Sequence, residues 1–427
     1  MSTNKLGKQT NALHFGYDKD KQQTVSVPIY QTTAYAFDTS LQASNRFSLQ
    51  ELGNIYSRLT NPTCDVLEKR ISVLEGGTAS VVTASGSAAL FYAVTNIAGS
   101  GDNVLVANKI YGGSTSLLFH TLKCFGIEAR EFDIDDLSTL ESKIDSKTKA
   151  IFFETLSNPQ IAVADIEAIA AIAKKHKIIS IADNTVASSY LCNPIAHGVD
   201  VVTHSLSKYA SGQGSVLAGS ITEREGLNEL IKDNPRYAHF NEPDESYHGL
   251  VYTSLPLPNY TLRIRIALLR DIGASLSPFN AWLVLQGLET LAIRIKKHSK
   301  NALKIAKFLE THPKVESVSY PALESNKYYA LSQKYFYKGR ASGLVSFVYK
   351  GSLEEARKVV DSTSIFSIVV NIGDTKSLIV HPASTTHSQL SEAELKKVGI
   401  LPNLIRLSVG IENIKDLKED LKEALGE

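Results

Sequence analysis

The chain has 427 residues, of which 43% are hydrophobic and 21% are charged, and its formal net charge is +1. This composition is ordinary for a globular protein of two or three domains, each large enough to bury a core. The near-neutral charge gives no electrostatic reason to expect nucleic acid or a membrane surface as a partner.

The three cysteines, Cys64, Cys124 and Cys192, are widely spaced and odd in number. They predict neither a disulfide framework nor a paired metal-ligand site, and they fit a reducing compartment best. Residues 1–11 lack the apolar core of a signal peptide, and no run reaches the roughly 18 apolar residues of a membrane span. We therefore expect a cytoplasmic protein that has no metal site and does not cross a membrane.

The first 61 residues show no sustained hydrophobic period and include a polar tract at 42–50. A segment of this kind cannot bury a core of its own. We therefore expect residues 1–61 to form an arm that lies on another surface, carrying Tyr56 and Arg58 near its end.

From residue 62 onward, short apolar strands alternate with helical segments. Strands are expected at 80–84, 104–107, 127–132, 150–154, in the two runs 178–185 and 199–209, and at 215–221. Residues 165–176 show the apolar spacing of a helix. This alternation predicts an α/β fold with a large, mostly parallel sheet covered on both faces, over 62–278.

The remaining chain predicts a second, smaller α/β domain. Residues 222–258 form a long polar loop with a compact cluster at 240–249, and loops of this length are usually functional or mobile. Residues 279–310 predict one long helix, or two consecutive helices, that lead into a domain over 279–427. Its strands are expected at 315–320, 343–349, 377–381 and 404–409, and its helices at 354–360, 391–398 and 414–425.

Two apolar runs in the middle of the chain stop abruptly in polar residues, one at Asp183 and the other at Lys208. Ligands bind at the carboxyl ends of strands in open α/β sheets. An Asp facing a pyridinium nitrogen, together with a Lys that forms a Schiff base, holds pyridoxal phosphate (PLP). Ser205 and Ser207 add hydroxyls that could hold the phosphate. The alternative is a buried Asp that caps a turn and a solvated Lys.

Four other positions could complete such a site. Ser85-Gly86-Ser87 lies between a strand and a helix, where backbone N–H groups can meet an anion. Tyr111 could cover a planar ring, or simply pack, and Asn158 could bond a ring hydroxyl, or only shape the turn before Pro159. Arg406 lies within an apolar strand and needs a partner, either a substrate carboxylate or a structural Asp or Glu.

Together these residues resemble the Cys/Met-metabolism family of PLP-dependent enzymes, whose fold is that of aspartate aminotransferase (fold type I). The resemblance runs from about residue 14 to the C-terminus. The matching motifs are Tyr56-Ser57-Arg58, residues 154–159, Asp183-Asn184-Thr185, residues 204–209 and residues 406–410. Ser87 replaces a common methionine, Ser207 replaces a common threonine, and residues 186–189 differ from the usual run.

The resemblance implies a role for each position. Lys208, Tyr111 and Asp183 would be catalytic. Lys208 would carry PLP and act as the base at the substrate Cα, and Asp183 would keep the ring nitrogen protonated. Arg406 and Asn371 would bind the substrate. The implied cofactor-binding residues are Tyr56, Arg58, Ser85, Gly86, Ser87, Tyr111, Asn158, Asp183, Thr185, Ser205, Ser207 and Lys208.

Within the family, residues 242–250 and the run 371–374 continuing to 381–387 resemble the O-acetylhomoserine sulfhydrylases. Gly113 stands where methionine γ-lyases usually have a cysteine. The implied reaction is a γ-replacement, in which sulfide displaces acetate from O-acetylhomoserine to give homocysteine for methionine biosynthesis. The implied assembly is a homotetramer of dimers that share active sites through Tyr56 and Arg58.

Several alternatives stay open at this point. A cystathionine γ-synthase or a related γ-lyase would have the same fold and cofactor. A protein that binds PLP without catalysis is a second possibility. A nucleotide-binding α/β domain that uses Gly212-Gln213-Gly214 is a third, although this pattern lacks a full dinucleotide fingerprint.

Overall fold

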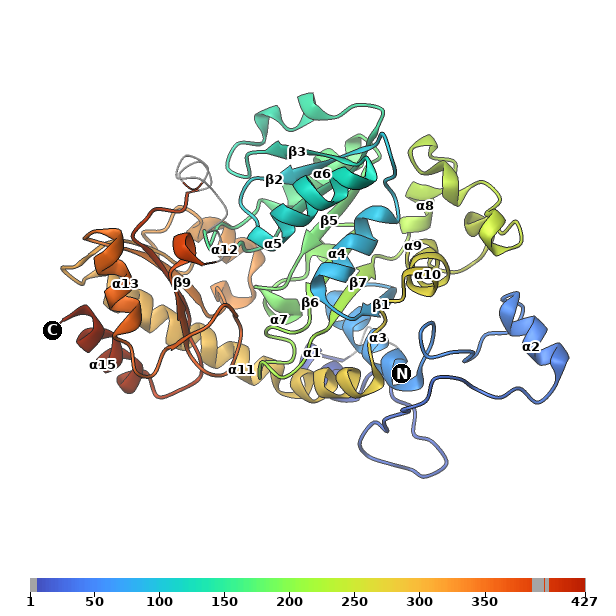
Figure 1. The fold of residues 1–427 in the computed structure, drawn as a ribbon, viewed down its shortest axis with the longest axis horizontal. Coiled ribbons are helices and arrows are strands. Elements are labelled where there is room, and N and C mark those ends of the chain that lie inside the picture. The colour runs from blue at the N-terminus through green and yellow to red at the C-terminus, as the bar shows by residue number, and fades with distance from the viewer. Residues whose placement is uncertain (1–5, 386–394, 396–398, 427) are drawn as a thin grey trace.

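The computed structural model describes residues 6–385, 395 and 399–426. These residues form a seven-stranded sheet, a five-stranded sheet and a long helix that runs between them (Figure 1). Except for residue 395, the helix expected at 391–398 falls outside the described residues, and so do the last two residues of the 381–387 stretch. The structure confirms the fold class, with a large mostly parallel sheet and a smaller second sheet.

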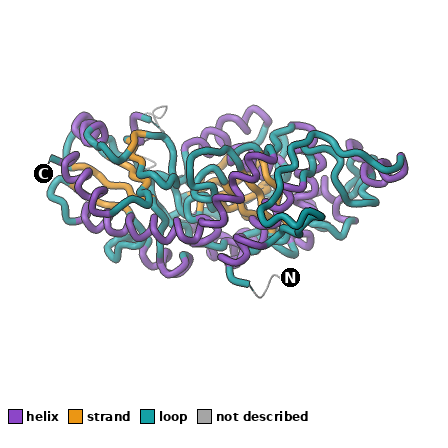
Figure 2. Tube along the Cα trace, turned by 90° about the horizontal axis from the view of Figure 1, so that it is seen from below, coloured by secondary structure: helices purple, strands orange, loops and turns teal. Residues whose placement is uncertain are grey.

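The larger sheet has the strand order β1-β7-β6-β5-β4-β2-β3. Its neighbouring strands are parallel except at β7, which runs antiparallel to both β1 and β6. Helices enclose the sheet, as Figure 2 shows. The strands are therefore buried, which explains why the strand sequences are apolar runs. The strands are β1 (Ala79–Thr83), β2 (Asn103–Ala107), β3 (Glu128–Phe132), β4 (Thr148–Glu154), β5 (Ile179–Asp183), β6 (Val201–Ser205) and β7 (Gly219–Glu223).

Strand β7 begins four residues later than the expected start at residue 215. Residues 215–218 instead belong to the loop that follows Lys208. The hydroxyl of Ser207 holds this loop, because it accepts a hydrogen bond from the Ala218 N–H at 3.0 Å and lies 3.2 Å from the Ala218 carbonyl oxygen. Local side-chain bonding therefore replaces the first ladder bonds of the strand.

The helices of this domain begin at the polar residues that follow strands. Helix α4 (Gly86–Thr95) is capped by the Ser85 hydroxyl, which accepts from the Ala88 N–H, and α6 (Ile166–Lys175) is capped by Asp165. The segment after Tyr111 is helical as expected but changes type along its length. It runs from α5 (Gly112–Thr115) through a π-helix (Ser116–Thr121) to a 3₁₀ turn (Leu122–Phe125). The other α-helices of this domain are α3 (Pro62–Glu75), α7 (Ser188–Leu191), α8 (Leu227–Ile231), α9 (Asn259–Arg263) and α10 (Arg270–Ile272).

Helix α11 (Pro278–Glu310) is one continuous helix of 33 residues, so the expected bridge is not divided into two. Pro278 occupies the first turn and Ser277 caps it. Along its buried side, Arg294 donates hydrogen bonds to the carbonyls of Tyr209 and Ala210, the residues that follow Lys208. The long helix thus fixes the backbone on which Lys208 stands.

The smaller sheet has the order β10-β11-β12-β9-β8 and is antiparallel except for the β10–β11 pair. Its strands are β8 (Val315–Ser319), β9 (Leu344–Tyr349), β10 (Ser367–Ile368), β11 (Leu378–Val380) and β12 (Leu404–Ser408). Helices α13 (Leu353–Asp361) and α15 (Ile414–Leu425) lie where the sequence predicts them. Strand β10 and helix α12 (Tyr329–Tyr335) were not predicted.

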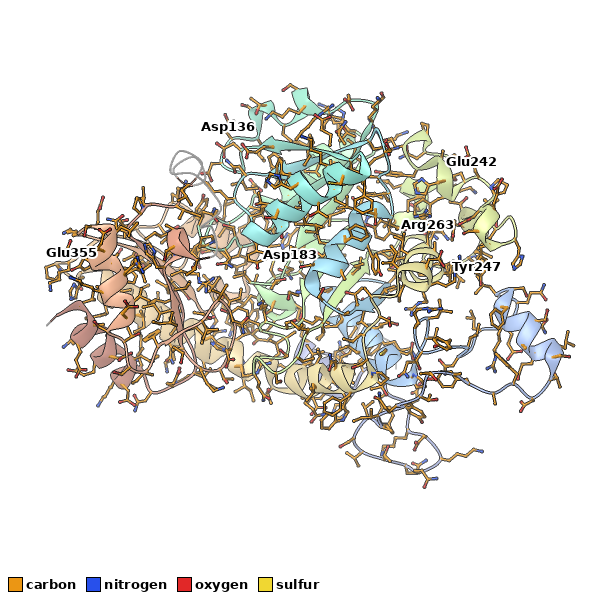
Figure 3. All side chains as sticks on the ribbon, in the orientation of Figure 1. Asp136, Asp183, Glu242, Tyr247, Arg263 and Glu355 are labelled. Carbon is orange, nitrogen blue, oxygen red and sulfur yellow. The ribbon has the colours of Figure 1, made fainter. Side chains whose placement is uncertain are left out.

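The N-terminal residues contain two short helices, α1 (Lys8–His14) and α2 (Ser40–Phe47), joined by extended chain. No residue of α2 is buried, and Figure 1 shows it standing away from the sheets. The 240–249 cluster lies on the same side. Its Tyr247 hydroxyl donates a 2.8 Å hydrogen bond to the Phe47 carbonyl. Figure 3 shows Tyr247 toward the end of the molecule that carries α2, well away from Asp183.

Within the described parts of the chain, no helix combines the length and apolar character that crossing a membrane requires.

Gly287 of α11 sets the distance between that helix and the loop after Lys208. A Cβ at this position would lie 2.5 Å from the carbonyl oxygens of both Ala210 and Ser211. Because both contacts are backbone atoms, Gly287→Ala should lose about 1–3 kcal/mol of stability. Thermal melting measures this effect. The control is Gly99→Ala, where a Cβ meets nothing within 4 Å, and equal melting temperatures for the two variants would contradict the prediction.

Candidate active site

The carboxyl ends of the parallel strands open into a cavity of about 210 Å³ that the small sheet closes on one side. The cavity brings together the predicted site residues of both domains. Those that line it are Ser85, Gly86, Ser87, Tyr111, Asn158, Asp183, Thr185, Ser205, Ser207, Lys208, Asn371 and Arg406.

Tyr56 and Arg58 do not line this cavity. They border a separate hollow, where the Arg58 guanidinium lies over the Tyr56 ring at 5.2 Å. Within one chain the structure therefore leaves this pair apart from Lys208.

Asp183 ends strand β5 and is held by hydrogen bonds to both carboxyl oxygens. The Thr185 N–H donates to Oδ1 at 2.9 Å, and the Thr203 hydroxyl donates to Oδ2 at 3.2 Å. Burial raises the pKa of Asp183, while these bonds and the charge of His204 oppose that rise. The site therefore provides specific support for the ionised form of a buried carboxyl.

Lys208 follows strand β6 and points to the small domain. Its ammonium donates to the Asn371 side-chain oxygen at 2.6 Å. Burial and the nearby Arg406 lower the pKa of Lys208 from its ordinary value. A lysine amine that loses its proton more easily is suited to act as a nucleophile and a base.

Arg406 is buried in β12 without an acidic partner among the described residues. Its Nη1 donates to the Asn158 side-chain oxygen at 3.1 Å and its Nη2 to the Asn371 carbonyl at 2.8 Å. Its Nε has no hydrogen-bond partner in the described structure. Burial lowers the pKa of Arg406 to about 10. An incompletely paired buried guanidinium that faces a cavity fits an incoming carboxylate, and the structural ion pair considered from the sequence is not present there.

The Ser85-Gly86-Ser87 turn and strand β6 approach closely at the start of α4. A Cβ on Gly86 would lie 2.6 Å from the Ser205 Cβ, so only glycine allows this contact. The Ser205 N–H in turn donates to the Thr185 hydroxyl at 2.8 Å. The result is a cradle of hydroxyls and a helix N-terminus, which suits a phosphate group.

Tyr111 stands at the mouth of the cavity, with its side chain partly exposed. A Cβ on Gly113 would lie 2.4 Å from the Tyr111 ring, so the absence of a side chain there permits the observed position of the ring. The Tyr111 N–H donates to Glu154 Oε1 at 2.7 Å. These contacts hold Tyr111 beside Glu154 in the lining of the cavity that Asp183 also borders. The donors, the cradle and the amine together fit PLP.

Glu154 is a site residue to which the sequence reasoning gave no role. It ends strand β4, lines the cavity and pairs in register with Asp183 on β5. Burial and the charge of Asp183 raise the pKa of Glu154 well above its ordinary value. Glu154 could have been found from the sequence, because it is a charged residue at the end of an otherwise apolar strand. The same signal identified Asp183.

The glycines proposed for nucleotide binding do not form such a motif. Gly212 and Gly214 both have positive φ and lie in the loop after Lys208. The next regular element is strand β7 rather than a helix, so no helix N-terminus faces them. Among the described residues, no group of three or more His, Cys, Asp or Glu side chains could hold a metal ion.

A sheet that carries a Lys and an Asp at neighbouring strand ends, with a small domain that supplies an Arg, defines a fold type I PLP-dependent enzyme. Residues 9–426 match the family described as Cys/Met metabolism PLP-dependent enzyme, and the chain belongs to that family.

Relatives and a solved structure resemble the chain over almost its full length. It is 44% identical to O-acetyl-L-homoserine sulfhydrylase of Leptospira meyeri, over 98% of this chain and 96% of that protein. It is 42% identical to homocysteine synthase of Schizosaccharomyces pombe, over 98% of this chain and 97% of that protein. A crystal structure from Campylobacter jejuni, described as a candidate O-acetylhomoserine (thiol)-lyase with N'-pyridoxyl-lysine-5'-monophosphate, shares 61% identity and a TM-score of 0.97. That likeness covers 99% of this chain and 100% of the other.

Replacing Glu154 by Gln should make stability less sensitive to alkaline pH. Because the folded state raises the pKa of Glu154, its contribution to stability is present at low pH and is lost as pH rises through the folded-state pKa. Glu154→Gln keeps an oxygen for the Tyr111 N–H and removes this titration. The melting temperature of the variant, relative to wild type, should therefore increase between pH 6 and pH 9. A constant difference over that range would show that Glu154 is already ionised.

Proposed function

We propose that the enzyme replaces the acetate of O-acetyl-L-homoserine with sulfide to give L-homocysteine, a step in methionine biosynthesis. The observation that carries this proposal is the buried Arg406, whose side chain lines the cavity with Lys208 and Asp183 and whose Nε has no hydrogen-bond partner in the described structure. An amino-acid substrate bound there by its carboxylate presents its Cα to the amine. The names of the full-length relatives support the choice of ester and nucleophile.

The proposed cofactor contacts follow from the cavity. Lys208 carries PLP, and Asp183 faces its ring nitrogen. Tyr111 stacks on the ring and Asn158 bonds its hydroxyl. The phosphate is held by Ser85, Gly86, Ser87, Thr185, Ser205 and Ser207. PLP, when bound, supplies an electron sink for the substrate carbons.

The protein side chains then bind the substrate and move its protons. Arg406 and Asn371 hold the substrate carboxylate, which fixes Cα near the Lys208 amine. Lys208, with its lowered pKa, takes the proton from Cα. A second proton leaves Cβ, acetate leaves Cγ and sulfide adds at that carbon. Protons then return to Cβ and Cα, so the net change is the replacement of acetate by sulfide. Tyr111 covers the cavity mouth during these steps and restricts the access of water.

We also propose three domains, with boundaries at 1–61, 62–278 and 279–427. Residues 1–61 form an arm that places Tyr56 and Arg58 beside the phosphate in the neighbouring subunit, and two such dimers give a tetramer. The exposed surface of α2 and the separation of Arg58 from its own cavity support this assembly. Three free cysteines support a reducing, cytoplasmic location.

The choice of nucleophile is tested by steady-state rates with O-acetylhomoserine. Turnover with sulfide should exceed turnover with cysteine, because the cavity is small and presents no second carboxylate-binding arginine among its lining residues. Lys208→Ala should lower kcat by on the order of 10³-fold or more while the fold is retained. Preferred formation of cystathionine would instead assign the enzyme to the synthases of the same family.

Shared active sites are tested by complementation between two inactive variants. Lys208→Ala and Arg58→Ala proteins should each be nearly inactive. After they are unfolded and refolded together, each hybrid dimer has one site with both residues and one site with neither. Random mixing should restore roughly one quarter of the sites. Recovery no greater than the sum of the separate variants would mean that Arg58 acts within its own chain.

A further inference from the structure

A second charged cluster is buried on the side of strands β5 and β6 away from the cavity. The Glu75 carboxylate at the end of α3 accepts a 2.5 Å hydrogen bond from the His204 Nε2. Asn184 donates to both Glu75 oxygens at 3.3 Å. The Glu75 side chain is 0% exposed and that of His204 is 6% exposed. None of these three residues lines the cavity.

This cluster is joined to the site through the backbone on both strands. Asn184 lies between Asp183 and Thr185, and His204 lies between Thr203 and Ser205. These four flanking residues are hydrogen-bonded to one another. The Thr185 N–H and the Thr203 hydroxyl donate to Asp183, and the Ser205 N–H donates to the Thr185 hydroxyl. The Glu75 bonds therefore fix the ends of β5 and β6 relative to each other.

The cluster can influence which of two buried carboxyl groups in the cavity is ionised. Glu154 and Asp183 are buried carboxyls at paired positions of neighbouring strands. Two such groups are not both ionised without compensating charge, so the environment decides which one holds the proton. The cations that bear on them are Lys208 and Arg406, which line the same cavity, and His204, whose charge lowers the pKa of Asp183. If Asp183 were protonated, it could not act as the anionic partner of a ring nitrogen.

His204 is the cation positioned to make this choice. Glu75 and Asp183 both favour its charged form and together raise its pKa, against the effect of burial. The other titratable groups around the cluster are Cys192, whose thiol is kept neutral by burial, and Lys8 of α1, whose pKa is lowered by burial. Lys8 donates to the Ser189 carbonyl at 2.7 Å, and the charge of Glu75 opposes the lowering of the Lys8 pKa.

We propose that Glu75 and His204 form a buried carboxylate–imidazolium pair whose positive member assigns the negative charge of the cavity to Asp183 and leaves Glu154 neutral. His204 is thus a positioning residue that acts through Asp183, and Glu75 acts through His204. This inference deepens the proposed function and rests on it for the role of Asp183.

The charge state of His204 can be measured without turnover. Hydrogen–deuterium exchange at imidazole C2, read by mass spectrometry of the holoenzyme, gives a titration midpoint for each histidine. His298 is an internal control, because it is also buried and burial lowers its pKa to about 4. His204 should titrate above an ordinary histidine, and Glu75→Gln should lower its midpoint. A His204 that titrates with His298 would overturn the proposal, whatever reaction the enzyme catalyses.

The effect on Asp183 is measured by the pH dependence of kcat. Without the cation, Asp183 keeps its proton to higher pH, so His204→Gln should move the acid limb upward by about one pH unit, a loss of up to about tenfold below the limb. Rates at high pH should approach wild type. His197→Gln is the matched control, because it removes an exposed His–Glu pair of 2.9 Å. Glu75→Gln should shift the limb in the same direction, and it serves as the second variant if His204→Gln does not fold.

A double-mutant cycle separates action through Asp183 from a structural effect. In an Asp183→Asn background, His204→Gln should cause no further loss of kcat, because the charge it controls is gone. A loss that is equal at all pH values and that adds to the Asp183→Asn defect would show that His204 only supports the fold, and the proposal would fail.

Discussion

Glu154 and Asp183 end neighbouring parallel strands in the same register, so the sheet itself places two buried acids side by side. Like charges at such positions repel strongly where water is excluded. The surrounding residues make the two environments unequal. Asp183 accepts hydrogen bonds from an N–H and a hydroxyl, and the charge of His204 lowers its pKa, whereas Glu154 accepts hydrogen bonds from backbone N–H groups. The proposed roles of the other cavity residues depend on this difference between the environments of Asp183 and Glu154.

The same sheet edge explains how distant segments come together. Each parallel strand delivers its following residues to one side, which is why Ser85, Asn158, Asp183 and Lys208 meet although they span more than a hundred positions. The smaller sheet adds Arg406 and its neighbour Asn371. Helix α11 links the two parts, and Arg294 on that helix holds the backbone just after the lysine. The cavity side chains are therefore positioned mainly by strand register and by hydrogen bonds to backbone carbonyls.

Local patterns were sufficient to predict every described strand except β10, and to single out Asp183 at the end of β5. Asp183 and Arg406 were found because a charged residue in an apolar strand needs a partner that its sequence neighbours do not supply. The pairing of Glu75 with His204 was not found, because 129 residues separate them and neither position has a periodic signal. The two arm helices were missed since they are short and bury little. The start of β7 was misplaced because a serine hydroxyl, rather than hydrophobicity, decides where the ladder begins.

The contact between Tyr247 and the Phe47 carbonyl joins the loop that marks the subgroup to the arm, far from the cavity. A loop placed there does not touch a substrate in the cavity of its own chain. In the proposed dimer the arm reaches a neighbouring subunit, so the loop that contacts the arm would act through the fit between subunits. Over evolutionary time, changes in residues 240–250 and in residues 40–50 should therefore be inherited together. The loop at 240–250, which distinguishes this subgroup in its sequence, would then reflect the packing of subunits against each other more than the choice of ester substrate.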